Sequence, residues 1–564
     1  DLCLVDRYIW LGVLYMKKRY SIGIDYGSMA GKSVLIDVDT GDEIAVSVFN
    51  YPHSVMTECL PDGKTKLEDG WALHDPQDYL DVLASTIPAL LKETDINPAD
   101  IIGIGVDFAS STVLPVKEDG TPICFMEEYK SEPHAYVKLW KHHAAQKYAD
   151  SLNKYAEKTN EDFLLKYGGK FSSEWLVPKI WQIAEEAPRV YDEMDKFIGA
   201  ADWIVWQLTG IEPINTQGIE NTLPSKEFLK SLNPKLEDFV DKKFKRKVSS
   251  IGKKAGELNQ FAAGLTGLKQ GTAVAVGNIN TQVSLPAVGI AVPCKLLMII
   301  GKSACDIVLG EEEKNISGIY CADKNSIIDG YYGYEAIQSG VGEHFDWFVK
   351  SSVPESYYRE ANALDMNIHQ LLRTKASKQR PGESGLLALD WWNGSRSVLM
   401  DKDLSGVMLG LNLQTRPEEI YRALLEATAY GARMILDTIR DAGIPVTELY
   451  AAGGVAQKDA FIMQIYADVM NMDIKIAGSV HTPALGSAMS GAVAAGKENG
   501  GYDTIEECAK ILGKTKAHYY RPIPENVETY NELYKEYKKL HNYYGKGGND
   551  VMKRLKDIKM ALKN

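Results

Sequence analysis

The sequence predicts an α/β protein made of two similar halves, and three observations support this fold class. A chain of 564 residues is too long for one hydrophobic core, so at least two large domains are expected. Residues 20–38 contain two apolar runs separated by a turn rich in Gly and Ser, which predicts a β-hairpin. Residues 297–305 repeat the pattern of an apolar strand followed by a Gly-x-Ser turn. The repetition indicates a duplicated βββαβα domain.

The composition is that of an ordinary globular protein with an acidic surface. A net charge of −13 gives no overall field that attracts nucleic acid or an anionic membrane. The seven cysteines are scattered and form no C-x-x-C pair, which argues against a disulfide framework or a zinc site. The apolar run at residues 8–15 is about half the length of a membrane span. We therefore expect a cytoplasmic protein with small-molecule ligands, with residues 1–15 as an extension outside the fold.

The first half is expected to continue with a third antiparallel strand, a helix and a buried strand. Asp75 and Pro76 are typical of an N-cap and a first helical residue, so a helix should run from there to about residue 91. A later apolar run ends at Asp107, and small polar residues including Ser110 follow it. Ligands gather at the carboxyl ends of buried strands, so Asp107 and Ser110 are candidate substrate ligands.

The second half is expected to begin near Gly264. Residues 272–281 predict a buried strand that breaks at Gly277 into polar residues including Asn280, and a long amphipathic helix is predicted over residues 416–438. Residues 525–564 carry Tyr and Lys at helical spacing, with Glu and Asp between the lysines. This pattern predicts a solvated helical tail, facing a partner or the rest of the chain, more than a basic arm for nucleic acid.

Two kinds of glycine turn are candidate nucleotide contacts. Gly27 and Gly31 allow backbone N–H groups to approach a phosphate closely, and Asp25 could hold Mg²⁺ or a phosphate-bound water. An ordinary acidic hairpin is the alternative interpretation. Gly453 and Gly454 would let the backbone pass flat against adenine, although a plain strand-to-helix turn has the same residues.

Longer runs of residues carry a resemblance to a known family. The chain resembles the FGGY carbohydrate kinases from about residue 20 to residue 496, and among them the ribulokinases. The family's C-terminal signature is matched by SGVMLGL at residues 405–411 with EIYRALLE at 419–426. The ribulokinase subfamily is indicated by WALHDP at 71–76, PHAYVKLWKHH at 133–143, YGGKFSSEW at 167–175 and LDWWNG at 389–394.

The resemblance implies an actin-like or hexokinase-like ATPase fold. Two ribonuclease-H-like domains would lie around a central cleft. The N-terminal domain, residues 16–262, would bind the sugar, and the C-terminal domain, residues 263–500, would bind ATP. Residues 501–564 would form the helical tail. The resemblance also implies ATP with Mg²⁺ as cofactors, a small sugar as substrate and a homodimer as a plausible assembly.

The resemblance further implies roles for individual residues. Asp25, Gly27 and Ser28 would face the β- and γ-phosphates, with Asp25 as the Mg²⁺ ligand. The remaining contacts fall into three groups: the matching phosphate turn at Gly301, Lys302 and Ser303; the adenosine contacts Gly453, Gly454 and Gln457; and the sugar contacts Ser110, Asp107, Thr222 and Glu335.

The sequence departs from the family at the positions of catalysis. Asn280 stands where the family has the Asp that acts as general base, and Asn cannot accept a proton at neutral pH. This change is expected to cost something like 10²–10⁴ in rate. Thr222 aligns with a substrate-contacting Lys, and the turn at residues 301–306 has gained Lys302 and Asp306.

Two hypotheses therefore follow from the sequence. The first is a working kinase of L-arabinose catabolism that converts L-ribulose and ATP into L-ribulose 5-phosphate and ADP. Asp306 or Asp107 would then replace the base, and Lys302 the missing lysine, while Glu335 would serve as a catalytic and sugar-binding carboxylate. The alternative is a catalytically impaired paralogue that binds nucleotide or sugar as a sensor or partner subunit.

Overall fold

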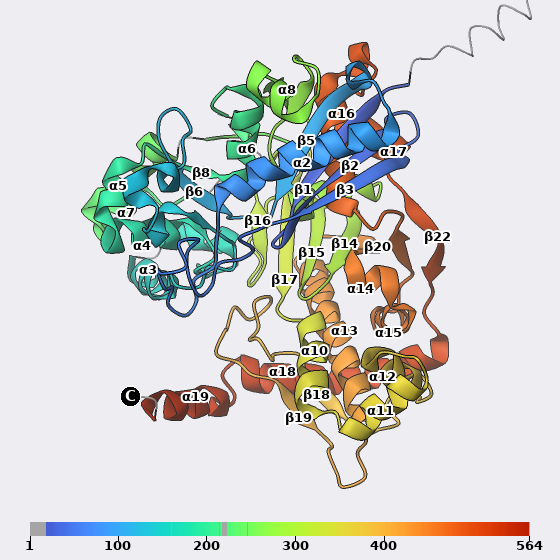
Figure 1. The fold of residues 1–564 in the computed structure, drawn as a ribbon. Coiled ribbons are helices and arrows are strands. Elements are labelled where there is room, and N and C mark those ends of the chain that lie inside the picture. The colour runs from blue at the N-terminus through green and yellow to red at the C-terminus, as the bar shows by residue number, and fades with distance from the viewer. Residues whose placement is uncertain (1–17, 160, 214, 217–222, 245, 563–564) are drawn as a thin grey trace, which may run out of the picture.

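The computed structural model describes residues 18–562 except 160, 214, 217–222 and 245. These residues form two lobes, each built on a seven-stranded sheet (Figure 1). The predicted extension at residues 1–15 and the predicted sugar contact Thr222 lie outside the described residues. None of the helices in the described part of the chain is long and apolar enough to cross a bilayer.

The first sheet contains the predicted hairpin and its third strand. β1, β2 and β3 are antiparallel neighbours, while β5 runs parallel to β1, and β12 and β13 run parallel to β5. Because β12 and β13 pair with β5, this sheet extends past the boundary predicted between residues 262 and 263. Its strands are β1 (Tyr20–Tyr26), β2 (Ala30–Asp37), β3 (Glu43–Asn50), β5 (Ile101–Phe108), β11 (Lys254–Glu257), β12 (Ala273–Ala275) and β13 (Asn278–Ile279).

The second sheet repeats the arrangement of the first. Antiparallel strands again come first in the chain, two parallel strands follow, and an antiparallel strand closes the far edge. The predicted duplication is therefore confirmed. The strands are β14 (Cys294–Ile300), β15 (Ala304–Gly310), β16 (Tyr320–Ala322), β17 (Tyr332–Gln338), β20 (Val446–Ala452), β21 (Ile474–Ala477) and β22 (Thr515–Tyr520).

Two helices lie between the sheets and hold the lobes together. They are α9 (Asn280–Ala287) and α16 (Thr482–Ala495), and one hydrophobic cluster joins them to β2, β14 and β15. α16 packs so closely on β1 and β5 that a Cβ added at Gly105 would lie 2.0 Å from the carbonyl oxygen of Ser487. Glycine is therefore required at this position, because any side chain would push the helix off the sheet.

The other elements surround the two sheets and the helices between them. In the first lobe they are β4 (Leu73–His74), α2 (Pro76–Thr94), β6 (Val113–Val116), β7 (Val137–Lys138), α3 (Gln146–Thr159), α4 (Leu176–Glu186), α5 (Pro188–Glu193), β8 (Lys196–Gly199), α6 (Ala200–Thr209), β9 (Asn215–Thr216), α7 (Lys226–Leu232), β10 (Lys247–Val248) and α8 (Gln260–Thr266). In the second lobe they are α10 (Gly342–Ser352), α11 (Glu355–Ala363), α12 (Ile368–Ala376), β18 (Leu387–Leu389), β19 (Val407–Leu409), α13 (Pro417–Asp441), α14 (Gly453–Lys458) and α15 (Ala460–Met470). α17 (Ile505–Leu512) packs in the same cluster as α9 and α16 (Figure 1).

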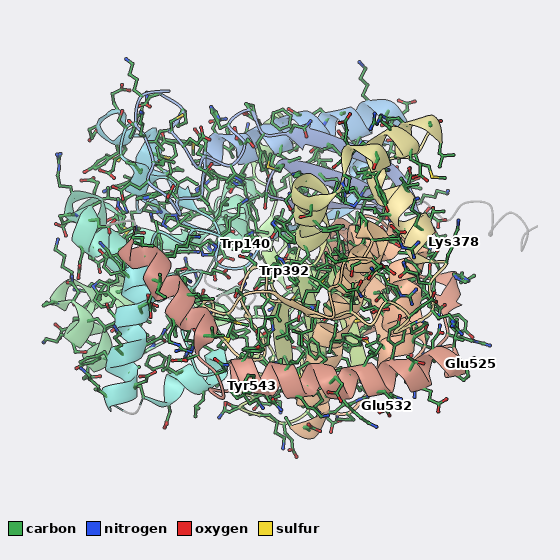
Figure 2. The ribbon with its side chains drawn as sticks, turned by 90° about the horizontal axis from the view of Figure 1, so that it is seen from below. Trp140, Lys378, Trp392, Glu525, Glu532 and Tyr543 are labelled. Atoms are coloured by element: carbon green, nitrogen blue, oxygen red, sulfur yellow. The ribbon has the colours of Figure 1, made fainter. Side chains whose placement is uncertain are left out.

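The C-terminal segment is helical as predicted, but much of it belongs to the core of the second lobe. α18 (Pro524–Gly545) buries Tyr530, Tyr534 and Tyr537 against α13. The hydroxyl of Tyr530 donates a hydrogen bond to Glu426 of α13 at 2.9 Å. Figure 2 shows α18 along the second lobe, with α19 (Val551–Ala561) extending from its Tyr543 end toward the first lobe. The tail is thus a structural part of the domain and less solvated than its composition predicts.

The close packing of α16 on the first sheet yields a stability prediction. Gly105→Ala should lower the free energy of unfolding by about 1–3 kcal/mol, because backbone must move to admit the methyl group. Gly264→Ala is the matched control: Gly264 is exposed in α8, and a Cβ there has no neighbour within 4 Å. The control should gain roughly 0.5–1 kcal/mol. Urea unfolding followed by fluorescence measures both, and equal stability of the two variants would contradict the packing argument.

Candidate active site

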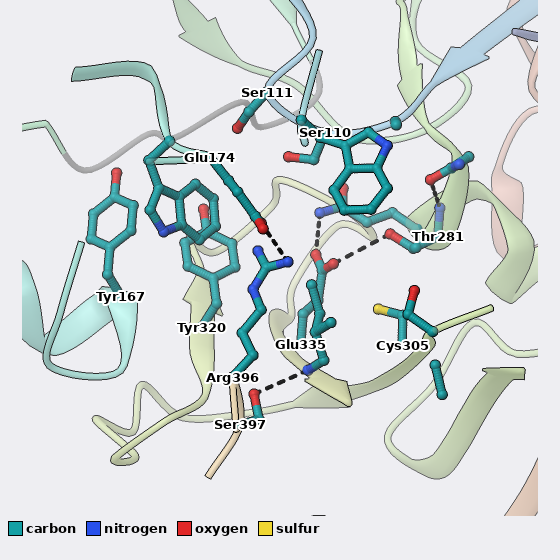
Figure 3. A pocket seen from close by; sticks show the side chains of 18 of the residues that line it. Ser110, Ser111, Tyr167, Glu174, Thr281, Cys305, Tyr320, Glu335, Arg396 and Ser397 are labelled. Atoms are coloured by element: carbon teal, nitrogen blue, oxygen red, sulfur yellow. Dashed lines mark hydrogen bonds and ion pairs between the residues drawn. The ribbon is translucent and has the colours of Figure 1, made fainter. Parts of the chain in front are cut away.

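A cavity of about 310 Å³ lies between the two lobes and takes its lining from both. The first lobe contributes the turn after β1 and the end of β5, including Ser28 and Ser110. Asn280, at the start of α9, and Ser303, in the turn between β14 and β15, also line it, as does Glu335 of β17. The structure thus brings six of the predicted site residues to one cavity (Figure 3): Gly27, Ser28, Ser110, Asn280, Ser303 and Glu335.

Glu335 is held in this cavity by neutral hydrogen-bond donors. The amide nitrogen of Gln282 donates to its Oε1 at 2.5 Å, and the hydroxyl of Thr281 donates to its Oε2 at 3.3 Å (Figure 3). Burial raises the pKa of the Glu335 carboxyl above its ordinary value. A carboxylate with a raised pKa and no cation bonded to it is a stronger proton acceptor than an exposed one.

Asn280 lines the cavity beside these donors. Its side-chain oxygen accepts a hydrogen bond from the backbone N–H of Thr281 at 2.7 Å, and its carbonyl accepts one from Ser284. Thr281 and Gln282, which follow it in α9, are the two residues that bind Glu335. Asn280 and Glu335 therefore belong to one hydrogen-bonded group, although Asn280 itself carries no basic atom.

Asp25 and Asp107 form a second acidic group at the ends of β1 and β5. They are register partners on adjacent strands, and Ser487 of α16 donates to Asp107 at 2.6 Å. The Lys32 ammonium lies 3.9 Å from Asp25. Burial raises the pKa of both carboxyls, and the charge of Asp25 raises that of Asp107 further. Two buried acids in contact are stabilised by a nearby cation.

The structure does not place Asp107 or Asp306 where a replacement base would be needed. Asp107 is fully buried beside Asp25, and neither aspartate is among the residues that line the cavity. On β15 the side chains alternate, so Cys305 lines the cavity and Asp306 points into the core of the second lobe. Burial there raises the pKa of Asp306 to about 7. The hypothesis that either aspartate replaces the base is not supported by this geometry.

The remaining predicted nucleotide contacts lie on turns of the second lobe and in α14. Gly301 donates to the carbonyl of Ser303 at 2.9 Å, which closes the turn, while Lys302 is exposed and does not line the cavity. Gly453 has a φ of 90° and passes close to Ile300, so glycine is required there. Gln457 donates its side-chain amide to the carbonyls of Ala477 and Ser479. The amide nitrogen of Gln457 is thus bonded to the backbone at the end of β21 and just after it, and holds it next to α14.

Several cavity residues were not predicted from the sequence. Glu174 and Trp175 lie before α4 in the first lobe, and Tyr320, Arg396 and Ser397 lie in the second. Glu174 and Trp175 belong to the run at residues 167–175 that carries the family resemblance. That run could have indicated from the sequence that these two residues belong to the site. Arg396 stands in an irregular loop where no periodic pattern marks it. The contact between the lobes creates this wall, so neither half predicts it alone.

Among the described residues, no group of three or more His, Cys, Asp or Glu side chains is arranged to hold a metal ion. The pair Asp25 and Asp107 could contribute carboxylate oxygens only together with ligands from elsewhere, such as phosphate oxygens and water. This is the usual situation of Mg²⁺ in kinases, which binds through one or two carboxylates plus substrate phosphates. An Oδ1 atom of Asp107 without a hydrogen-bond partner is available for such a role.

Comparison with known proteins agrees with this geometry. Residues 20–286 match the N-terminal domain, and residues 296–495 the C-terminal domain, of the FGGY family of carbohydrate kinases. A ribulokinase of Bacillus licheniformis is 55% identical over 94% of this chain and 98% of its own length. A ribulokinase of Geobacillus thermodenitrificans is 50% identical over 96% of this chain and 98% of its own length.

Solved structures share the fold at lower identity. A xylulose kinase from Rhodospirillum rubrum has a TM-score of 0.74 and 22% identity, covering 93% of this chain and 98% of its own. A Plasmodium falciparum glycerol kinase, solved with ADP, has a TM-score of 0.72 and 16% identity, covering 93% of this chain and 98% of its own. The actin-like or hexokinase-like fold predicted from the sequence is confirmed. Since both halves match in order and relatives at 50–55% identity align over nearly the whole length, the chain belongs to the FGGY family of carbohydrate kinases.

Proposed function

We propose that this protein is an ATP-dependent ribulokinase of L-arabinose catabolism. It would transfer the γ-phosphoryl group of ATP to the 5-hydroxyl of L-ribulose and release L-ribulose 5-phosphate and ADP. The names of the two ribulokinases reported above support the substrate. The observation that carries the proposal is the cavity between the lobes, because it joins phosphate-type turns of both halves to a buried carboxylate. The relatives' names give no support to the alternative of a non-catalytic sensor.

In this proposal the two lobes divide the substrates between them. Gly453 and Gly454 lie beside the adenosine, and Gly301 to Ser303 face Gly27 and Ser28 across the β- and γ-phosphates. Mg²⁺, held by Asp25 and Asp107 through water and phosphate oxygens, would neutralise the phosphate charge. Ser110 contacts the sugar from the first lobe. Lys302, which is exposed, approaches ATP from the outside of the turn.

Glu335 accepts the proton of the sugar hydroxyl in the proposed reaction. Glu174 and Glu335 are the carboxylates among the described residues that line the cavity, and Glu174 is paired with Arg396. Asn280 orients the hydroxyl through its amide, next to the Thr281 and Gln282 side chains that hold Glu335. Positioning and charge neutralisation supply most of the rate enhancement in phosphoryl transfer. Turnover is therefore compatible with a base at Glu335 in place of one at position 280.

The compartment and assembly follow as further proposals. The six cysteines of the described residues are all free, which fits the reducing cytoplasm where ATP is found. A homodimer stays a prediction. The acidic net charge of −13 makes association with nucleic acid unfavourable.

The proposed activity is tested directly on the purified protein. ADP release should require L-ribulose and Mg²⁺ and proceed on the order of 1–100 s⁻¹, as in other kinases. A phosphorus NMR spectrum should identify the phosphate ester at carbon 5. Binding of ATP and L-ribulose without ADP release would contradict the proposal and favour the sensor.

The role of Glu335 predicts a pH-dependent defect. Glu335→Gln should lower kcat by about 10²–10⁴, because the amide cannot accept a proton. In the wild type, kcat/KM should fall as the pH drops through the pKa of Glu335. Because burial raises this pKa, the fall should occur at a pH above 4.5, the ordinary pKa of a Glu side chain. The Gln variant should lose this acid limb.

A companion variant separates proton transfer from sugar binding. Asn280→Asp places a second carboxylate at the start of α9, so adding Glu335→Gln to it should cost much less kcat than Glu335→Gln alone. If Glu335→Gln raises KM in both backgrounds and leaves kcat unchanged, then Glu335 binds the sugar and does not accept its proton.

A further inference from the structure

One wall of the cavity is formed by an ion pair between the two lobes. Arg396, in the loop between β18 and β19, places Nη1 2.5 Å from Oε2 of Glu174 in the first lobe. Both residues line the cavity, and their side chains are only 21% and 11% exposed. In Figure 3 the Arg396 side chain lies between Tyr320 and Glu335. A partly buried guanidinium therefore faces the space where the sugar is proposed to bind.

The same wall is fixed by further contacts between the lobes. The backbone N–H of Gly318 donates to the carbonyl of Gly168 at 2.8 Å, and the rings of Trp175 and Tyr320 lie 5.1 Å apart. Lys402, six residues after Arg396, forms a separate ion pair with Asp150 at 3.3 Å, and about half of each side chain is exposed. These contacts hold Arg396 at a defined position relative to the first lobe.

Arg396 and the phosphate-type turn lie on different sides of Glu335. In Figure 3 Cys305, two residues after Ser303 of that turn, is on one side of Glu335 and Arg396 is on the other. A short linear sugar whose terminal hydroxyl approaches Ser303 and Glu335 would extend its other end toward Arg396.

The chemistry of a 2-ketopentose fixes what that other end presents. Its only unstrained ring closes from the 5-hydroxyl onto the C2 carbonyl and consumes both groups. A transfer to the 5-hydroxyl therefore requires the open-chain form, in which C2 carries a free carbonyl. A carbonyl oxygen only accepts hydrogen bonds, and a guanidinium only donates them.

We propose that Arg396, oriented by Glu174, binds the C2 carbonyl of the open-chain ketose and so determines the preference for ketoses over sugar alcohols. The inference rests on the proposed function, since it names the form in which that site takes its substrate. Glu174 is a positioning residue: it occupies one nitrogen of the guanidinium, which has five N–H donors in all. The negative charge of Glu174 also balances the positive charge of Arg396, so this wall of the cavity suits a neutral sugar. Together, the carboxylates of Glu174 and Glu335 disfavour binding of a negatively charged sugar acid.

The test compares L-ribulose with ribitol and L-arabinitol, which differ from it by reduction of the C2 carbonyl. Calorimetric titration of the full-length protein with each sugar should show that the wild type prefers the ketose by about 10- to 100-fold. Arg396→Met should reduce this preference to within about 3-fold, with little change in the affinity for the pentitols. Arg396→Lys keeps the charge but loses the planar fork, so it should retain only part of the preference. If Arg396→Met does not fold, the same titrations with Arg396→Lys test the proposal.

Two variants separate carbonyl recognition from closure of the lobes. Lys402→Met breaks the neighbouring ion pair outside the cavity and should leave the preference unchanged. Glu174→Gln should weaken binding of the ketose more than binding of the pentitols, because Arg396 loses its orientation. Equal weakening of all three sugars by Arg396→Met, or a wild type that binds ketose and pentitols equally, would overturn the inference.

Binding also distinguishes this inference from the proposed function. If the wild type binds L-ribulose with the expected preference but releases no ADP, the kinase proposal fails and the role of Arg396 stands. If it phosphorylates L-ribulose and the pentitols with equal kcat/KM, and Arg396→Met changes neither, the kinase proposal stands and the role of Arg396 fails.

Discussion

The close contact between α16 and the first sheet is the constraint on which the rest of the structure depends. The carbonyl of Ser487 occupies the place of a side chain at Gly105, so the helix lies directly on β5. The hydroxyl of the same serine donates to Asp107, which fixes the acidic pair at the strand ends. α16 also packs on α9, the helix that begins with Asn280. One backbone contact therefore sets the positions of both the acidic pair and the start of α9.

The carboxylates of the site have different partners, and this gives them different chemistry: Glu174 and Glu335 line the cavity, while Asp25 and Asp107 lie at the ends of β1 and β5. Burial raises the pKa of Glu335 above its ordinary value, and this outweighs the lowering by its hydrogen bonds from Gln282 and Thr281 and by the charge of Arg396. Glu174 pairs with Arg396 and serves to hold a donor in place. Asp25 and Asp107 face each other and gain from a cation. Three environments thus separate proton transfer, sugar recognition and charge neutralisation within one cleft.

Local patterns in the sequence predicted much of the fold but less of the site. The first hairpin and the N-cap at Asp75 follow from interactions between residues close in the chain, and the duplication was predicted from a repeated strand-and-turn pattern. The hypothesis about Asp306 did not follow, because strand side chains alternate and one position decides between cavity and core. The C-terminal helix was predicted as solvated, yet its tyrosines are buried, since their partners on α13 are about a hundred residues away in the sequence.

The sequence by itself determined the family, the two-lobed architecture and the turns that flank the cleft, because strands, caps and glycine turns are specified by short segments. It also showed that residue 280 is an asparagine and lacks a basic atom. Only the tertiary structure decided that Glu335 is bonded to the two residues that follow Asn280, and that Arg396 of one lobe meets Glu174 of the other. The contact between Arg396 and Glu174 joins residues more than two hundred positions apart, in segments without a regular pattern. Its geometry exists only when the two lobes are packed together.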